Sequence, residues 1–224
     1  ELMKLLKEAR QALEPYKKYL DDNSVKSAYD SLSRWVAVEE QNEREKKEEQ
    51  DIHKLYSQFH GNDFARVISI KTKWGNSLRE WIVQLSNGKG TLDTRWGNKW
   101  DEWVLTIPNG KASIQTKWGN SLREWKYKSD DSLITIQTKW GNGWREWLIK
   151  DADNKTLELS TKWGNSWREW VVKGPNGTME ISTKWGNNWD EWVIKDKMPG
   201  EKVHLKMAVI FTCIFTSCII EDKE

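Results

Sequence analysis

The segment TKWGNGWREW, residues 138–147, decides the fold, because six versions of it follow one another along the chain. The other versions are TKWGNSLREW at 72–81 and 116–125, TRWGNKWDEW at 94–103, TKWGNSWREW at 161–170 and TKWGNNWDEW at 183–192. They recur every 22 residues, with one step of 23. A fixed period of this kind is typical of repeat architectures, in which each unit buries its apolar face against its neighbours.

Apolar and polar residues alternate before each Trp-Gly-Asn, which is the period of a β-strand. Ile134, Ile136 and Trp140 share one face, and Trp147 continues that face after the turn. The connectors carry strong turn signals, such as Pro-Asn-Gly at residues 108–110. The pattern therefore predicts six β-hairpins, or about twelve antiparallel strands, with two inward tryptophans in each hairpin.

The charged residues of the repeat favour one register. A loop of four residues after Trp140 would place Thr138 opposite Trp147 and Lys139 opposite Glu146. The same register sets the arginine that follows the loop beside the Trp140 ring. Both cross-strand contacts are favourable, so we expect this register in every hairpin.

A sheet that is apolar on one face must hide that face, by closing into a barrel, by forming a sandwich or by winding as a solenoid. The 17 tryptophans, all but Trp35 within the repeats, could fill the wide interior of a twelve-stranded barrel. We therefore expect a mainly β fold with a closed, barrel-like arrangement, and keep the solenoid as the alternative.

The repeats divide the chain into three parts. Residues 1–61 read as helical, with Pro15 interrupting the first helix, and form a helical hairpin or oligomerising helices. Residues 62–198 form the tryptophan-rich β domain. Residues 199–224 carry a run of thirteen mainly apolar residues, AVIFTCIFTSCII, whose β-branched content predicts a strand. That segment is expected to be a buried strand, an interior plug, an oligomer contact or a membrane-inserting element.

The composition disfavours several classes of function. A formal net charge of +2 gives no overall attraction for nucleic acid or an anionic membrane. The three histidines are isolated, and the two cysteines, Cys213 and Cys218, have no metal-ligand or catalytic pattern around them. We expect no enzyme activity, no cofactor and no metal.

The six hairpin loops are the candidate site, because the fixed period places them all at one end of the domain. Each combines a tight Gly-Asn turn with a large apolar residue and neighbouring charges. Exposed indole rings beside amide and charged groups are suited to sugars, and weak sites gain by avidity. The residues expected to bind are Trp100, Trp144, Trp167, Trp189, Asn98, Asn142, Asn165, Asn187, Arg145 and Arg168. In the alternative interpretation, the loop tryptophans pack on the next hairpin and Gly-Asn only serves the turn.

We therefore expect a multivalent, lectin-like protein that binds glycans or glycoconjugates. The second hypothesis is a structural, self-assembling β-repeat scaffold, joined through the N-terminal helices or the C-terminal segment. The third is a pore-forming or membrane-active protein that uses the apolar C-terminus. A chain that begins with Glu1 leaves room for a removed signal peptide, and a secreted or cell-surface location is favoured over a cytoplasmic one.

Overall fold

The computed structural model describes residues 2–19, 23–59, 62–75, 77–97, 99–119, 121–141, 143–164, 166–186 and 188–221. The chain forms two compact units, Glu1–Lys54 and Leu55–Glu224. The first unit is helical. The second contains all of the repeats and is the β domain.

The helical unit has a break where proline predicts one. Helix α1 spans Leu2–Leu13, the 3₁₀ helix η1 spans Glu14–Tyr19, and α2 spans Asn23–Tyr56. Pro15 lies in η1, where its missing N–H ends the regular helix. Lys7 and Glu40 form an ion pair across the two helices, with Nζ and Oε1 3.4 Å apart.

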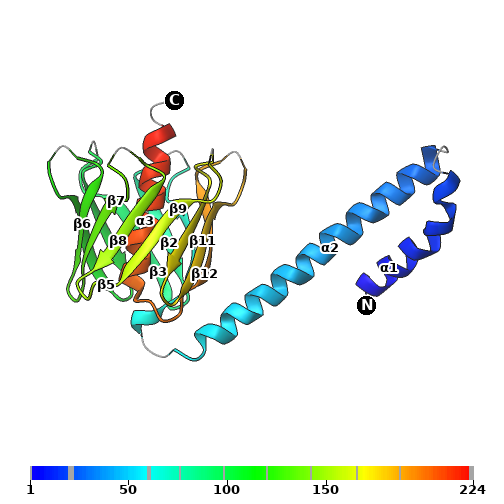
Figure 1. Cartoon of the computed structure of the whole chain (residues 1–224), viewed down its shortest axis with the longest axis horizontal. Coiled ribbons are helices and arrows are strands. Elements are labelled where there is room, and N and C mark those ends of the chain that lie inside the picture. Colours follow the sequence, from blue (N-terminus) through cyan, green and yellow to red (C-terminus); the bar gives the residue numbers. More distant parts are fainter. Residues whose placement is uncertain are drawn as a thin grey trace. The chain divides into compact units, whose positions relative to one another are not determined.

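The β domain is a closed barrel of twelve antiparallel strands, as the repeat pattern predicts (Figure 1). The short 3₁₀ helix η2, Asn62–Phe64, precedes the barrel. The strands are β1 Val67–Thr72, β2 Glu80–Leu85, β3 Gly88–Thr94, β4 Glu102–Ile107, β5 Gly110–Thr116, β6 Glu124–Ser129, β7 Leu133–Thr138, β8 Glu146–Asp151, β9 Thr156–Thr161, β10 Glu169–Gly174, β11 Gly177–Thr183 and β12 Glu191–Lys197. Each strand pairs with its neighbours in sequence, and β1 pairs with β12 to close the barrel.

The register within the repeats agrees with the charge pattern at the strand ends. Thr138 pairs with Trp147, and the Lys139 N–H donates to the Glu146 carbonyl at 2.9 Å. Three connectors at the opposite end use a glycine with positive φ: Gly88, Gly110 and Gly177. A Cβ at Gly177 would lie 2.1 Å from the Lys197 carbonyl oxygen, so this turn also needs glycine for space.

One tryptophan per hairpin fills the barrel interior, not two. These six inward tryptophans are at most 1% exposed, and each indole N–H donates to the carbonyl three residues earlier at 2.8–2.9 Å. They are Trp81, Trp103, Trp125, Trp147, Trp170 and Trp192. Burying the ring while satisfying its one donor makes this position stable in every repeat.

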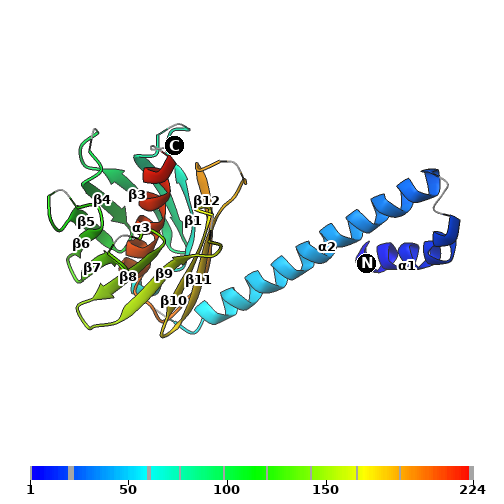
Figure 2. The same ribbon diagram turned by 45° about the horizontal axis from the view of Figure 1, so that its top comes forward.

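The apolar C-terminal segment is a helix, so the predicted strand is wrong. Helix α3, Val203–Glu221, runs through the barrel, and the strands surround it in two views (Figures 1 and 2). The predicted interior plug is thus present in helical form. A closed barrel offers no free strand edge, so an inserted strand would leave its backbone groups unpaired, whereas a helix satisfies its own.

Side chains on α3 match this enclosed position. The hydroxyls of Thr212, Thr216 and Ser217 each donate to the carbonyl four residues earlier at 2.7–2.8 Å. Phe211 and Phe215 contact the Trp125 ring edge-on, with centroids 5.0 and 4.6 Å away. The polar atoms are therefore satisfied within the helix, and the apolar ones meet the inward tryptophans.

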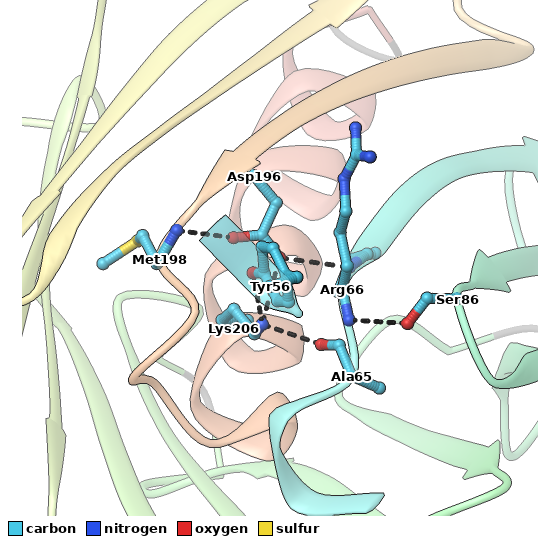
Figure 3. Close-up of polar contacts among 8 residues, drawn as sticks. Tyr56, Ala65, Arg66, Ser86, Asp196, Met198 and Lys206 are labelled. Carbon is cyan, nitrogen blue, oxygen red and sulfur yellow. Dashed lines mark hydrogen bonds and ion pairs between the residues drawn. The ribbon is translucent and has the colours of Figure 1, made fainter. Parts of the chain in front are cut away.

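A buried ion pair fixes the first turn of α3 to the seam of the barrel (Figure 3). Lys206 and Asp196 are both 0% exposed, with Nζ and Oδ2 3.0 Å apart. Lys206 also donates to the Tyr56 hydroxyl at 2.9 Å and the Ala65 carbonyl at 2.7 Å. The Asp196 carboxylate accepts the backbone N–H groups of Val67 at 3.1 Å and of Met198 at 3.0 Å. All three ammonium protons are used, which compensates for the desolvation of the charges.

His204 makes a second buried contact near the start of α3. The Tyr127 hydroxyl lies 2.6 Å from His204 Nδ1, and the ring also bonds the Asn109 backbone. Burial lowers the pKa of His204 below its ordinary 6.5, which favours the neutral ring. A neutral imidazole that accepts from Tyr127 can donate from its other nitrogen to the Asn109 carbonyl.

Candidate glycan-binding rim

The six Trp-Gly-Asn turns all lie at the end of the barrel where α3 finishes (Figure 1), and we call this end the rim. In each turn, the carbonyl of the tryptophan accepts the N–H three residues later at 2.9–3.1 Å. The basic residue before that tryptophan donates its N–H to the glutamate carbonyl of the next strand at 2.8–2.9 Å. The turn therefore starts at the tryptophan, which has already left the sheet.

The first tryptophan of each repeat is exposed, so the predicted second inward ring is wrong. These rim tryptophans are 57–65% exposed, and they are Trp74, Trp96, Trp118, Trp140, Trp163 and Trp185. Strand alternation does not extend to them, because their carbonyls are committed to the turn. Six indole faces consequently meet the solvent at one end of the molecule.

Each rim indole lies among charged groups. The indole N–H of Trp96, Trp140 and Trp163 donates to the glutamate six residues later. The preceding basic side chain lies 5.5–5.8 Å from the ring centroid in four repeats, as with Lys117 and Trp118. The hydrogen bond from Lys117 lowers the pKa of Glu124. These contacts orient the rings and leave a face of each accessible.

The second tryptophan of the loop, which the sequence analysis placed in the candidate site, is half-buried. These shoulder tryptophans are Trp100, Trp144, Trp167 and Trp189. Each packs on the barrel core and lies 5.7–6.0 Å from the inward tryptophan of its own hairpin. In the alternative interpretation these rings cap the barrel end or pack on the next hairpin; they are half-buried, but the adjacent hairpin that contacts them is the preceding one.

Arginine joins each shoulder tryptophan to the hairpin before it. The guanidinium carbons of Arg79, Arg123, Arg145 and Arg168 lie 4.3–5.0 Å from the ring centroids of Trp100, Trp144, Trp167 and Trp189, respectively. Arg145 was expected beside Trp140 of its own hairpin, and it stacks on Trp167 of the next hairpin instead. The cause is strand pairing: β8 and β9 are neighbours in the sheet, so the fourth and fifth hairpins lie close enough for the long side chain to cross.

The sequence carries a signal for this pairing in residues that change together. Asp101 and Asp190 replace the arginine in the second and sixth repeats. The hairpins that follow them around the closed barrel are the third and the first, which carry Leu122 and Leu78 in place of the shoulder tryptophan. Arginine is thus always followed by tryptophan and aspartate by leucine, a rule that holds only if the sixth hairpin adjoins the first.

The loop asparagines of the candidate site fall outside the described residues. This applies to Asn98, Asn142, Asn165 and Asn187, and their use as ligands stays a prediction. Arg145 and Arg168 are described, and both act as stacking partners of shoulder tryptophans.

The rim is hollowed between the fourth and fifth hairpins. An open groove of about 490 Å³ is lined by Trp140, Gly143, Trp144, Arg145, Glu146 and Trp167. Four of these six residues are aromatic or arginine and one is a carboxylate, so the groove combines apolar faces with a hydrogen-bond donor and an acceptor.

No protein-family model matches the chain, and no curated protein or solved structure shows significant similarity to it. Within the described ranges, no cluster of His, Cys, Asp and Glu could hold a metal ion. In the same described ranges, no helix is both long enough and apolar enough to span a membrane. The rim is therefore assigned from its own geometry.

Proposed function

We propose that the protein is a multivalent carbohydrate-binding module whose rim contacts glycans. The observation that carries this proposal is the ring of six rim tryptophans, 57–65% exposed at one end of a closed barrel. A pyranose ring packs its C–H face on an indole, and its hydroxyls need donors and acceptors close by. The rim supplies both next to each ring, as the Lys117–Glu124 ion pair beside Trp118 illustrates.

Exposed aromatic rings are costly unless they have a partner, because their apolar faces are left in water. Here the cost is repeated in six turns, although the turn hydrogen bonds involve only backbone atoms of the tryptophan. The fold thus does not require an indole at this position. A shared binding role explains why all six repeats keep one, and several weak sites facing one way would act together by avidity.

A glycan array combined with haemagglutination tests the proposal. The intact protein should bind a defined group of glycans, and the triple variant Trp118→Ala, Trp140→Ala and Trp163→Ala should lose most of the signal. A matched control carries Lys111→Ala, Lys126→Ala and Lys173→Ala on exposed strand positions of the barrel wall. Absence of binding by the intact protein, or equal loss in both triple variants, would refute the proposal.

The scaffold hypothesis is a second candidate, favoured by exposed apolar groups on α2. Trp35 is 67% exposed and Val38 is 54% exposed in the helical unit. Light scattering should show an oligomer that Trp35→Glu dissociates, and a strict monomer would refute this role. By contrast, residues 203–218, which a membrane-active protein would use, are buried inside the barrel.

A further inference from the structure

The six rim turns are not equivalent, and the groove between the fourth and fifth hairpins has two features that no other repeat shares. It has a glycine where the other repeats have a side chain. Its glutamate lacks the usual ion pair. Like the junction between the fifth and sixth hairpins, it lies between two shoulder tryptophans, here Trp144 and Trp167.

The glycine in this turn provides space in the groove and is not required by the backbone conformation. Gly143 occupies the position that is Ser77, Lys99, Ser121, Ser166 or Asn188 in the other repeats. It has no positive φ, and a Cβ there would have only ordinary contacts with Trp140, at 3.8 and 4.0 Å. The turn would accept a side chain, as its five relatives do. The missing side chain therefore leaves the floor of the groove open.

The glutamate of this groove is free of its cross-strand cation. Five rim glutamates pair with the basic residue of their own hairpin, as in Lys184 with Glu191 at 3.0 Å. Lys139 instead pairs with Glu158 at 3.0 Å. Among the described residues, Glu146 forms no ion pair, and its one side-chain hydrogen bond comes from the Trp140 indole to Oε2. Oε1 is consequently available as an acceptor.

Arg145 supplies the opposite hydrogen-bonding character. Its guanidinium stacks on Trp167 at 4.5 Å, and its buried Nη1 has no hydrogen-bond partner among the described residues. A polar nitrogen without a partner is costly, and a small shift toward a ligand oxygen would relieve that cost. The equivalent atom of Arg123 donates to the Gly141 carbonyl at 2.7 Å, whereas that of Arg79 also has no partner among the described residues. Arg145 is the one of these two unpartnered arginines that lines the groove.

We infer that the groove between the fourth and fifth hairpins is the principal saccharide site of the rim and takes an uncharged pyranose. This inference rests on the proposed function. One face of the sugar stacks on the exposed Trp140 ring, one hydroxyl donates to Glu146, and a neighbouring hydroxyl accepts from Arg145. The guanidinium of Arg145 and the carboxylate of Glu146 have opposite charges, so the groove gives no net attraction to an acidic or an amino sugar, and a neutral ring that uses both groups fits best. The remaining turns act as weaker copies.

An NMR titration of the full chain, with ¹⁵N-labelled indoles, tests this assignment. The probes are methyl β-D-glucopyranoside, methyl β-D-galactopyranoside and methyl α-D-mannopyranoside, with N-acetylneuraminic acid as the acidic counterpart. At least one neutral glycoside should shift the Trp140 indole N–H before the other rim signals. Gly143→Ser, which installs the residue of three sister repeats, should weaken binding about tenfold, as expected when one contact is blocked.

Matched variants separate this inference from the proposed function. Trp140→Ala should abolish the tight phase of binding, and Trp74→Ala, the same substitution in the first repeat, should leave it unchanged. Equal effects of these two variants, or no effect of Gly143→Ser, would overturn the principal site while the glycan function stands. Preferential binding of N-acetylneuraminic acid would overturn the neutral class. No binding of any probe or array glycan would refute both.

Discussion

The contact between Arg145 and Trp167 should couple the fourth and fifth hairpins energetically. The guanidinium carbon lies 4.5 Å from the ring centroid, and both side chains are half-buried. Cation–π contacts contribute about 0.5–1 kcal/mol at exposed sites and about 2 kcal/mol when desolvated. A half-buried pair should fall between these limits, so we expect a coupling free energy of about 1 kcal/mol.

A double-mutant cycle measures this coupling. Urea unfolding of Arg145→Ala, Trp167→Ala and the double variant gives the free energy of unfolding of each, and the departure from additivity is the coupling. The same cycle on Asp101 and Leu122, at a junction without the stacked pair, should be additive within about 0.5 kcal/mol. An additive result at Arg145 and Trp167, or equal coupling at both junctions, would refute the role given to the arginines.

Three further predictions concern the barrel. Lys206→Met should lower the free energy of unfolding by about 3–5 kcal/mol, because it leaves Asp196 buried without its cation, and adding Asp196→Asn should recover part of the loss in the same denaturation assay. Because burial lowers the pKa of His204, the folded state keeps this ring neutral at pH values where the unfolded chain binds a proton, so stability is full above pH 6.5 and is lost as the pH falls from 6.5 through the folded-state pKa. The melting temperature of the native chain should drop in this pH range, and that of His204→Gln should drop less. Trp147→Ala should lower the free energy of unfolding in urea by about 3–5 kcal/mol, whereas Trp140→Ala, at an exposed ring, should lower it by less than about 1 kcal/mol. Similar losses would contradict the assignment of Trp147 to the core and Trp140 to the rim.

The repeat pattern was sufficient to predict the barrel because each hairpin repeats the same local rules. Alternation up to Thr138, the charge pair that follows it and the connector turns all point to one register. The alternation pattern predicted the wrong side for the Trp140 ring, because a backbone hydrogen bond of the turn removes that residue from the sheet. Periodicity alone does not show where a strand ends and its turn begins.

The form of the C-terminal segment depended on its surroundings. β-Branched residues such as Val209 and Ile210 favour strands by intrinsic propensity, but inside a closed barrel only a helix satisfies its own backbone. Prediction of the site from the sequence was likewise limited, because its residues make non-local contacts. The position of Trp167 depends on Arg145 from the previous hairpin. One signal in the sequence predicts this contact: where a repeat has aspartate in place of the arginine, the next hairpin around the barrel has leucine in place of the shoulder tryptophan.

Hydrogen exchange at the indole N–H groups tests most directly whether each repeat has one tryptophan in the core and one on the rim. In a ¹⁵N-labelled sample transferred to D₂O, the six inward indoles should exchange only with opening of the barrel, since each N–H is buried and bonded to a carbonyl. The six rim indoles should exchange within the first spectrum. Twelve protected indole signals from the repeats' first and last tryptophans would mean that both rings point inward, and the rim would then have no exposed aromatic surface with which to bind a sugar.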